Sequence, residues 1–198
     1  YRLNTDLVAD NRTKLKEIIL DQMKKRKTKF SIYYTGTSDN TQENMDLVME
    51  EINEENPYEY HTRKGWAWQA QMLDNKYEIV FNVEYLHNIE QENQIQQKVN
   101  EVIDEKITDN MEDYEKIKVI HDYIVLNSFY GTDTESSPHS PYALLFEGSG
   151  VCQAYASLTY KFLDKLGFDQ HYVTGTSNGE AHGWNLVNVD ELCKALHN

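Results

Sequence analysis

The residue type and surroundings of Cys152 suit a nucleophile. It follows the glycine-containing stretch 148–151, and apolar side chains recur at helical spacing over residues 155–166. The sequence therefore predicts a helix with Cys152 at or just inside its N-terminus. There the helix dipole and the unpaired backbone N–H groups favour an anion, which raises the thiolate fraction of a cysteine. The same N–H groups could also bind the oxyanion of a tetrahedral intermediate.

His182 is the matching candidate for a general base. Residues 170–175 have the composition of a short strand, residues 176–180 that of a polar turn, and residues 181–187 that of a returning strand. A base at a strand end beside a cysteine at a helix end is a workable catalytic pair. A cysteine on an apolar helix is more often an inert core residue, and a histidine beside a turn is more often a surface residue. The interpretation therefore depends on finding both together.

Residues from about Tyr114 to Val189 resemble the transglutaminase-like domain of bacterial and eukaryotic proteins. The stretches that carry the resemblance are 117–124, 142–145, Gly150-Val151-Cys152-Gln153-Ala154-Tyr155-Ala156, 173–175 and Ala181-His182-Gly183-Trp184-Asn185-Leu186-Val187. The resemblance implies an α+β fold related to papain and a Cys-His-Asp triad. It also implies acyl transfer on peptide or glutamine-amide substrates, by hydrolysis or cross-linking. The family's cysteine corresponds to Cys152 and its histidine to His182.

The aspartate of the triad does not carry over to this chain. Asn188, Val189 and Asp190 still fit the family pattern, but residues 191–198 do not, and His197 falls near the place of the aspartate. We therefore expect a transglutaminase-like domain that is incomplete at its C-terminus and holds a dyad of cysteine and histidine. The alternative is a catalytically inactive domain that keeps the fold and binds a protein.

Other residues near these motifs have both a functional and a structural interpretation. Trp184 and Asn185 could shape a substrate cleft, although Trp184 could equally be a core residue. Tyr142 could present its hydroxyl to the cleft, but packing is the stronger expectation. We expect His139 in a surface turn and His121 as a structural helix residue. Histidines and carboxylates nowhere show the spacing of metal ligands, so we expect no metal and no cofactor.

Hydrophobic periodicity predicts mixed α and β structure before these motifs. Apolar spacing predicts a strand at 30–34 and helices at 15–23, 45–52, 95–107 and 114–127. Two alternating runs around Asp74 and Asn75 predict a β-hairpin. Its Trp66 and Trp68 are expected on the core face of a sheet or, alternatively, in a ligand platform.

The periodicity changes from β to helical near residue 88, which suggests a domain boundary. We expect a small α+β domain of unknown role at residues 1–88 and the transglutaminase-like domain at residues 89–198. The chain opens on Tyr1 rather than Met, so we expect a fragment or a processed form. The compartment stays open, with a secreted or cell-surface location slightly favoured over the cytoplasm.

The composition excludes several classes of protein. The 198 residues carry 19 basic and 33 acidic side chains, and the net charge of −14 argues against nucleic acid as a partner. The basic run 24–29 is expected to be the solvated end of a helix. Two cysteines, Cys152 and Cys193, are too few for a disulfide scaffold, and we expect them not to bond to each other. No apolar run approaches the length of a membrane span.

The expected partner is a protein or peptide substrate. Because the sequence stops soon after His182, residues 181–189 are expected to form an exposed sheet edge, and exposed edges recruit strands from other chains. We therefore expect a homo-oligomer through this edge, unless a helix-like run at residues 192–196 folds back over it.

Overall fold

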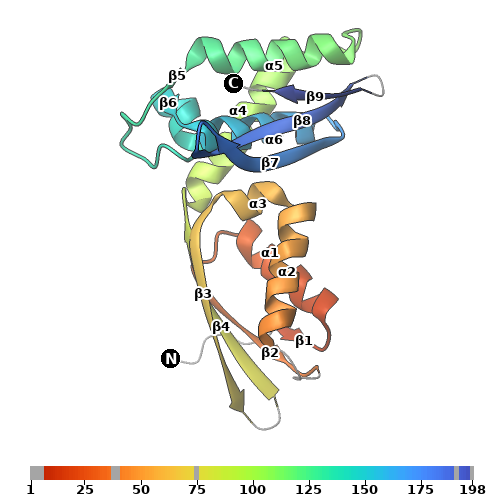
Figure 1. Cartoon of the computed structure of the whole chain (residues 1–198), viewed down its shortest axis with the longest axis vertical. Coiled ribbons are helices and arrows are strands. Elements are labelled where there is room, and N and C mark those ends of the chain that lie inside the picture. The colour runs from red at the N-terminus through yellow and green to blue at the C-terminus, as the bar shows by residue number, and fades with distance from the viewer. Residues whose placement is uncertain (1–6, 37–40, 74–75, 190–191, 197–198) are drawn as a thin grey trace. The chain divides into compact units, whose positions relative to one another are not determined.

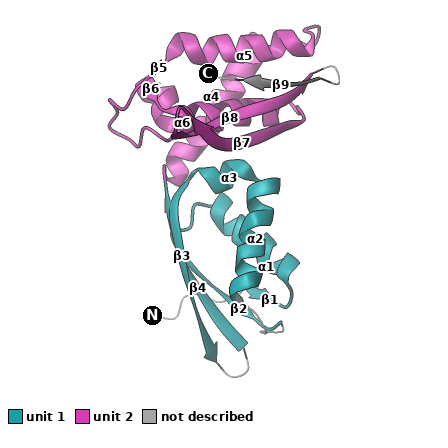
Figure 2. Cartoon of the chain, in the orientation of Figure 1, with its two compact units in different colours: residues 1–85 teal, residues 86–198 magenta. Residues whose placement is uncertain are grey.

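The chain separates into two compact units, as Figure 1 and Figure 2 show. The computed structural model describes residues 7–36, 41–73, 76–189 and 192–196. The first unit is Tyr1–Tyr85 and the second is Leu86–Asn198, so the division falls close to the predicted boundary. That each unit folds as an independent domain stays a prediction. Within the described ranges, none of the helices has the length and apolar character needed to cross a membrane.

The first unit is a sheet with helices on one face (Figure 1). Its strands pair in the order β1-β2-β4-β3; the β1–β2 pair is parallel and the other pairs are antiparallel. The elements in chain order are β1 (Val8–Ala9), α1 (Arg12–Lys24), β2 (Lys29–Tyr34), α2 (Thr41–Glu55), α3 (Pro57–His61), β3 (Arg63–Leu73) and β4 (Lys76–Tyr85). The predicted helices, strand and hairpin are present, and the predicted turn residues Asp74 and Asn75 lie outside the described residues. The sequence did not predict α3, in which Pro57 occupies a first-turn position that proline favours.

The core of the first unit lies between the helices and the sheet. Apolar side chains of α1, α2 and the facing strands form one buried cluster. In it Phe30 and Phe81, on neighbouring strands, stack with their ring centroids 4.8 Å apart. Trp66 and Trp68 pack against the same cluster. The structure therefore places both tryptophans on the core face of the sheet.

The basic run 24–29 was predicted to be solvated, but its Arg26 is buried. Arg26 follows the end of α1 in a left-handed backbone conformation, with φ of 51°. Its guanidinium donates to Thr62 Oγ1 at 2.8 Å and lies 5.8 and 5.2 Å from the ring centroids of Tyr58 and Tyr85. These cation–π contacts compensate for the loss of water around the charge. The arginine thus links the end of α1 to α3 and to the end of β4.

The second unit packs three described α-helices and a π-helix with two small sheets. The strands β5 and β6 pair in parallel, and β7, β8 and β9 pair antiparallel in that order. The elements are α4 (Ile89–Lys106), α5 (Asp113–Asn127), β5 (Phe129–Tyr130), the π-helix η1 (Ala143–Glu147), β6 (Ser149–Gly150), α6 (Cys152–Lys165), β7 (Gln170–Ser177), β8 (Glu180–Val189) and β9 (Leu192–Leu196). The mixture of helix and strand confirms the predicted α+β class.

Helix capping and two buried clusters organise the second unit. Asn88 begins α4 with a capping box: its side chain accepts from the Gln91 N–H at 2.9 Å, and the Gln91 side chain accepts from the Asn88 N–H at 3.0 Å. Apolar faces of α4, α5 and α6 form the larger cluster. Val187 and Val189 of β8 pack in a smaller cluster with residues of α5 and α6. Helix α6 therefore lies between the other helices and the β8 sheet.

The segment 192–196 is a strand, so its predicted helical character is wrong. The backbone of β9 pairs antiparallel with β8, with Leu196 opposite Asn185 and Leu192 opposite Val189. The expected exposed edge at 181–189 is therefore covered along residues 185–189 within the same chain. Because residues 185–189 already pair with β9, the argument for an oligomer through this edge does not hold along these residues. The side chain of Cys193 lies outside the described residues.

His61, at the end of α3, makes the stability of the first unit depend on pH. Burial and, secondarily, the charge of Arg63 lower the pKa of His61 from its ordinary 6.5 to about 4. Folding thus favours the neutral imidazole, so its contribution is present above about pH 6.5 and is lost as the pH falls toward 4. We predict that the wild type loses about 2 kcal/mol of unfolding free energy between about pH 7 and pH 5 that a His61→Gln variant does not lose.

Urea unfolding followed by tryptophan fluorescence measures this difference. The exposed His139 supplies the control, because a His139→Gln variant should keep the pH dependence of the wild type. Equal pH dependence in the wild type and in His61→Gln would show that His61 does not carry the effect.

Candidate active site

Helix α6 places Cys152 at its first residue, as predicted. The N-cap residue Val151 provides no side-chain hydrogen bond, whereas Asn11 and Asn88 cap α1 and α4 with their side chains. The start of α6 therefore lacks the side-chain cap that would occupy its first N–H groups, which suits it to an anion. Cys152 is a free thiol and is partly exposed.

Close packing sets the backbone that leads into α6. The π-helix η1 ends at Gly148, whose φ of 73° favours glycine. A Cβ on Gly150 would lie only 3.0 Å from the Ala154 Cβ and 3.2 Å from the Pro138 carbonyl oxygen. The Val151 N–H donates to the same carbonyl at 2.9 Å. Gly150 thus lets the loop 131–142, between β5 and η1, pack against the start of α6.

A buried polar network holds the same loop. His87 Nδ1 lies 3.0 Å from Ser140 Oγ, and His87 Nε2 lies 2.6 Å from Glu92 Oε2. Glu92 also pairs with Lys161 of α6. The order serine, histidine, carboxylate resembles that of a hydrolase triad, but Ser140 is 0% exposed and presents no hydroxyl to the surface. The network is therefore structural, and it ties the loop to the start of α4 and to α6.

His182 lies on β8, opposite Gly175 of β7, in the predicted hairpin. Its ring stacks on the ring of Trp184, with centroids 5.9 Å apart and planes at 27°. The indole in turn covers Gly175, where a Cβ would lie 2.9 Å from Trp184 Cη2. Gly175 thus makes room for the indole that supports the imidazole.

The strand β8 packs directly on α6 beside the two candidate residues. A Cβ on Gly183 would lie 3.8 Å from the Ala156 Cβ and 3.3 Å from Tyr172 Oη. Ala156 follows Cys152 by about one helical turn, and Gly183 is the chain neighbour of His182. The fold therefore brings the strand with the candidate base to the first turns of the helix with the candidate nucleophile.

Two tyrosines that the sequence analysis did not single out lie beside Cys152. Burial raises the pKa of Tyr172 to about 12, the nearby Ser157 hydroxyl opposes this shift, and the charge of Cys152 adds to it. Burial also raises the pKa of Tyr130, which lies on β5 opposite Gly150, two residues before Cys152. The chain contains 14 tyrosines, so residue type alone could not mark these two.

The other candidate residues take mostly structural positions. Asn185 is 0% exposed, and within the described part of the chain neither polar atom of its side chain has a hydrogen-bond partner, so it does not line an open cleft. Tyr142 packs against the helical core. His139 is exposed, and His121 is partly buried with its Nδ1 3.3 Å from a carboxylate oxygen of the neighbouring aspartate.

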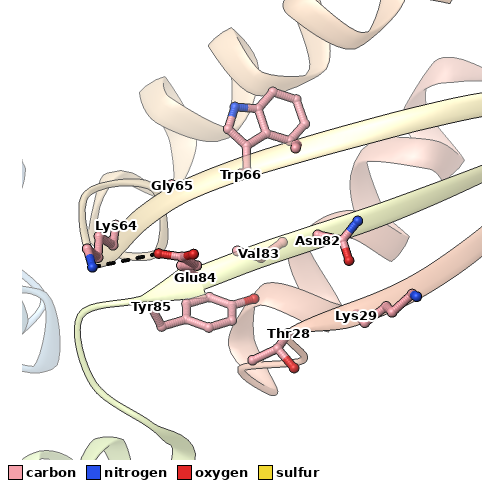
Figure 3. A pocket seen from close by; sticks show the side chains of 10 residues that line it. Thr28, Lys29, Lys64, Gly65, Trp66, Asn82, Val83, Glu84 and Tyr85 are labelled. Carbon is pink, nitrogen blue, oxygen red and sulfur yellow. Dashed lines mark ion pairs between the residues drawn. The ribbon is translucent and has the colours of Figure 1, made fainter.

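A hollow of about 790 Å³ lies on the first unit and is lined by residues of β3, β4 and the start of β2 (Figure 3). Lys64 and Glu84 pair at 3.7 Å at one end of it, and Trp66 also lines it. Its lining contains no cysteine or histidine, so it offers no alternative nucleophile and base. In the described ranges, no cluster of three or more histidine, cysteine or acidic side chains is arranged to hold a metal ion.

A sequence comparison finds a match that lies within the second unit. Residues 97–192 match the sequence model of the transglutaminase-like superfamily. The matched residues lie in the second unit, which is therefore similar to the transglutaminase-like superfamily.

Solved structures also show similarity, all at low identity. A protein described as a TGase has a TM-score of 0.47 and 10% identity over 96% of this chain and 58% of its own. A proposed cysteine protease from Cytophaga hutchinsonii has a TM-score of 0.43 and 12% identity over 67% of this chain and 64% of its own. A proposed protease from Parabacteroides distasonis has a TM-score of 0.39 and 11% identity over 85% of this chain and 39% of its own. The chain thus spans less than two thirds of each of these proteins. The comparison with curated proteins finds no match.

The network around His87 should control the stability of the second unit. A His87→Phe variant keeps a similar ring but leaves Ser140 and Glu92 without their histidine partner in a buried site. We predict a loss of about 3 kcal/mol in unfolding free energy, measured by urea unfolding followed by circular dichroism. His139→Phe is the matched control, because His139 lies in the same loop but is exposed. If His87→Phe were as stable as this control, the network would not hold the loop.

Proposed function

We propose that the second unit is a cysteine-dependent acyl-transfer enzyme for peptide or glutamine-amide substrates, with Cys152 as nucleophile and His182 as general base. The observations that support the proposal are the position of Cys152 at the first residue of α6 and the packing on that helix of β8, the strand that carries His182. The similarity of residues 97–192 to the transglutaminase-like superfamily supports the same pair of residues.

The proposed reaction has two stages. In the first, His182 takes the thiol proton and Cys152 Sγ attacks the substrate carbonyl carbon, while the π electron pair moves to the oxygen beside the N–H groups of α6. The C–N bond then breaks, and His182 returns the proton to the leaving nitrogen. In the second stage, water or an amine attacks the thioester and releases the acyl group. The acceptor decides between hydrolysis and cross-linking.

A dyad needs some other means of orienting the imidazole. In triad enzymes, loss of the control that the aspartate exerts on the histidine costs a factor on the order of 10⁴ in rate. Here the ring of Trp184 lies against His182, and close packing over Gly175 fixes that indole. Stacking restricts the ring plane but provides neither a charge nor a choice of tautomer.

The second candidate function is a non-catalytic module that keeps the fold and binds a protein. The departure of residues 191–198 from the family pattern, where the aspartate would stand, favours this alternative. The two candidates differ in the chemistry of Cys152, because only the enzyme needs a thiolate that His182 activates.

Alkylation by iodoacetamide at about pH 6 distinguishes the two functions. A thiol with an ordinary titration is almost wholly protonated at this pH, so fast reaction reports an activated thiolate. We predict that Cys152 reacts at least about 10-fold faster than it does in the urea-unfolded chain, and that His182→Ala removes this advantage. Peptide mapping by mass spectrometry separates labelling at Cys152 from labelling at Cys193.

The matched control is His171→Ala, which removes an exposed histidine from β7 of the same sheet. This variant should react like the wild type. Equal alkylation of Cys152 in the folded and unfolded chains, or in the wild type and His182→Ala, would contradict the enzyme and leave the binding module.

A further inference from the structure

Strand β3 forms one edge of the sheet in the first unit (Figure 1). It pairs with β4 on one side, and among the described residues no strand pairs with its other side. In an antiparallel pair every second residue turns its backbone N–H and C=O groups away from the neighbouring strand. The outer side of β3 therefore presents a row of backbone donors and acceptors to a further strand.

The regular part of this edge lacks the features that protect edges from pairing. The register of β3 against β4 shifts between Arg63 and Gly65, which places a bulge at Lys64. Beyond the bulge the pairing is regular over residues 65–73, and these residues include no charged side chain and no proline. Soluble proteins protect edge strands with lysines, prolines and bulges. On β3 the lysine and the bulge lie at one end, and residues 65–73 are open to pairing.

The side chains of β3 alternate between two faces of the sheet. Trp66 and Trp68 pack against the buried cluster on the face that the helices cover, and Ala70 and Met72 follow on the same face at the period of two. The Trp66 ring is fixed by stacking on Phe81, with centroids 6.3 Å apart and planes at 12°. Ala70 is exposed, and Met72 is 63% exposed. This face thus has two large rings at one end of the strand and a small and a flexible side chain at the other.

We propose that the first unit binds a second copy of this chain through antiparallel pairing of β3 with β3. Two identical antiparallel strands are related by a twofold axis, and complete overlap of residues 65–73 puts that axis at Gln69. Trp68 then lies opposite the partner's Ala70, and Trp66 lies opposite the partner's Met72. Each ring meets a small or flexible side chain instead of another ring, and a methionine sulfur beside a ring is a favourable contact.

The open face of the strand fits the same register. Leu73, which is 43% exposed, lies opposite the partner's Gly65, where a Cβ would meet nothing within 4 Å. The two copies of Gln69 meet at the axis, and each amide can donate to the other. The pairing therefore covers exposed apolar side chains and brings no like charges together.

The distribution of charge also favours the first unit as the place of self-association. Residues 1–85 carry 12 basic and 15 acidic side chains, whereas residues 86–198 carry 7 basic and 18 acidic side chains. Two first units therefore repel each other less than two second units do. The opposite edge of the sheet is β1, which has only two residues, so the pairing closes at a dimer. This inference concerns the first unit and does not depend on the proposed function of Cys152.

Sedimentation equilibrium of the full chain measures the association. We predict that the average mass rises with concentration from the 23.2 kDa of one chain toward the mass of two chains and stops there. Gln69→Lys puts two like charges opposite each other at the axis, so it should weaken the association by at least about 10-fold. The matched control is Gln94→Lys, which adds the same charge at an exposed position of α4 and should associate like the wild type.

A disulfide cross-link tests the register. In a chain that also carries Cys152→Ser and Cys193→Ser, Gln69→Cys puts two thiols opposite each other, with Cα atoms about 4.5 to 5.5 Å apart and within the range of a disulfide. We predict that mild oxidation converts this variant to a covalent dimer. The control is Gln71→Cys, which lies opposite the partner's Ala67. Its two thiols belong to residues roughly 14 Å apart along the strands, which is too far for a disulfide.

Three results would overturn the proposal. The first is the mass of one chain at every concentration up to about 1 mM. The second is equal association of the wild type and Gln69→Lys, because the copies would then meet through another surface. The third is cross-linking of Gln71→Cys as complete as that of Gln69→Cys, which would exclude this register. Circular dichroism shows whether Gln69→Lys is folded, and the cross-link decides the question if that variant unfolds.

Discussion

The close approach of β8 to α6 is the constraint on which the candidate site depends. Gly183 lets the strand come within contact distance of Ala156, and any larger side chain there would meet the Tyr172 hydroxyl at 3.3 Å. The chain neighbour of this glycine is His182, and Ala156 lies one turn beyond Cys152. Gly183, in the short motif around the histidine, thus has a packing reason, because it sets how near β8 can come to α6.

The second requirement is that the helix start itself is held in place. Gly150 packs against Ala154, the Val151 N–H bonds to the loop at 2.9 Å, and His87 holds that loop through Ser140. None of these groups presents chemistry to a substrate. They act through the backbone at the start of α6, whose N–H groups serve an oxyanion only if their direction is fixed before the substrate binds. The stability of the second unit and the proposed chemistry therefore depend on the same contacts.

The sequence predicted those parts of the fold that depend on local periodicity. The helices around Ile95 and Ile120 and the hairpin of β3 and β4 follow from apolar spacing, because each buries one face against a single core. The run 192–196 was misinterpreted, since its leucines, lysine and alanine favour a helix while pairing with β8 makes it a strand. The candidates Cys152 and His182 came from two short motifs, and their role as a catalytic pair stays a prediction. The structural role of His87 could not be predicted from the sequence, because only the folded chain brings His87 to Ser140.

The most direct test of the account is the distance between Cys152 Sγ and the nearer ring nitrogen of His182 in a crystal structure of the reduced chain. A nucleophile and its base must lie near hydrogen-bond reach, and sites without substrate are often somewhat looser. The account predicts a separation within about 4 Å, with the imidazole still stacked on Trp184. A separation of more than about 8 Å in an otherwise intact second unit would contradict the catalytic pair.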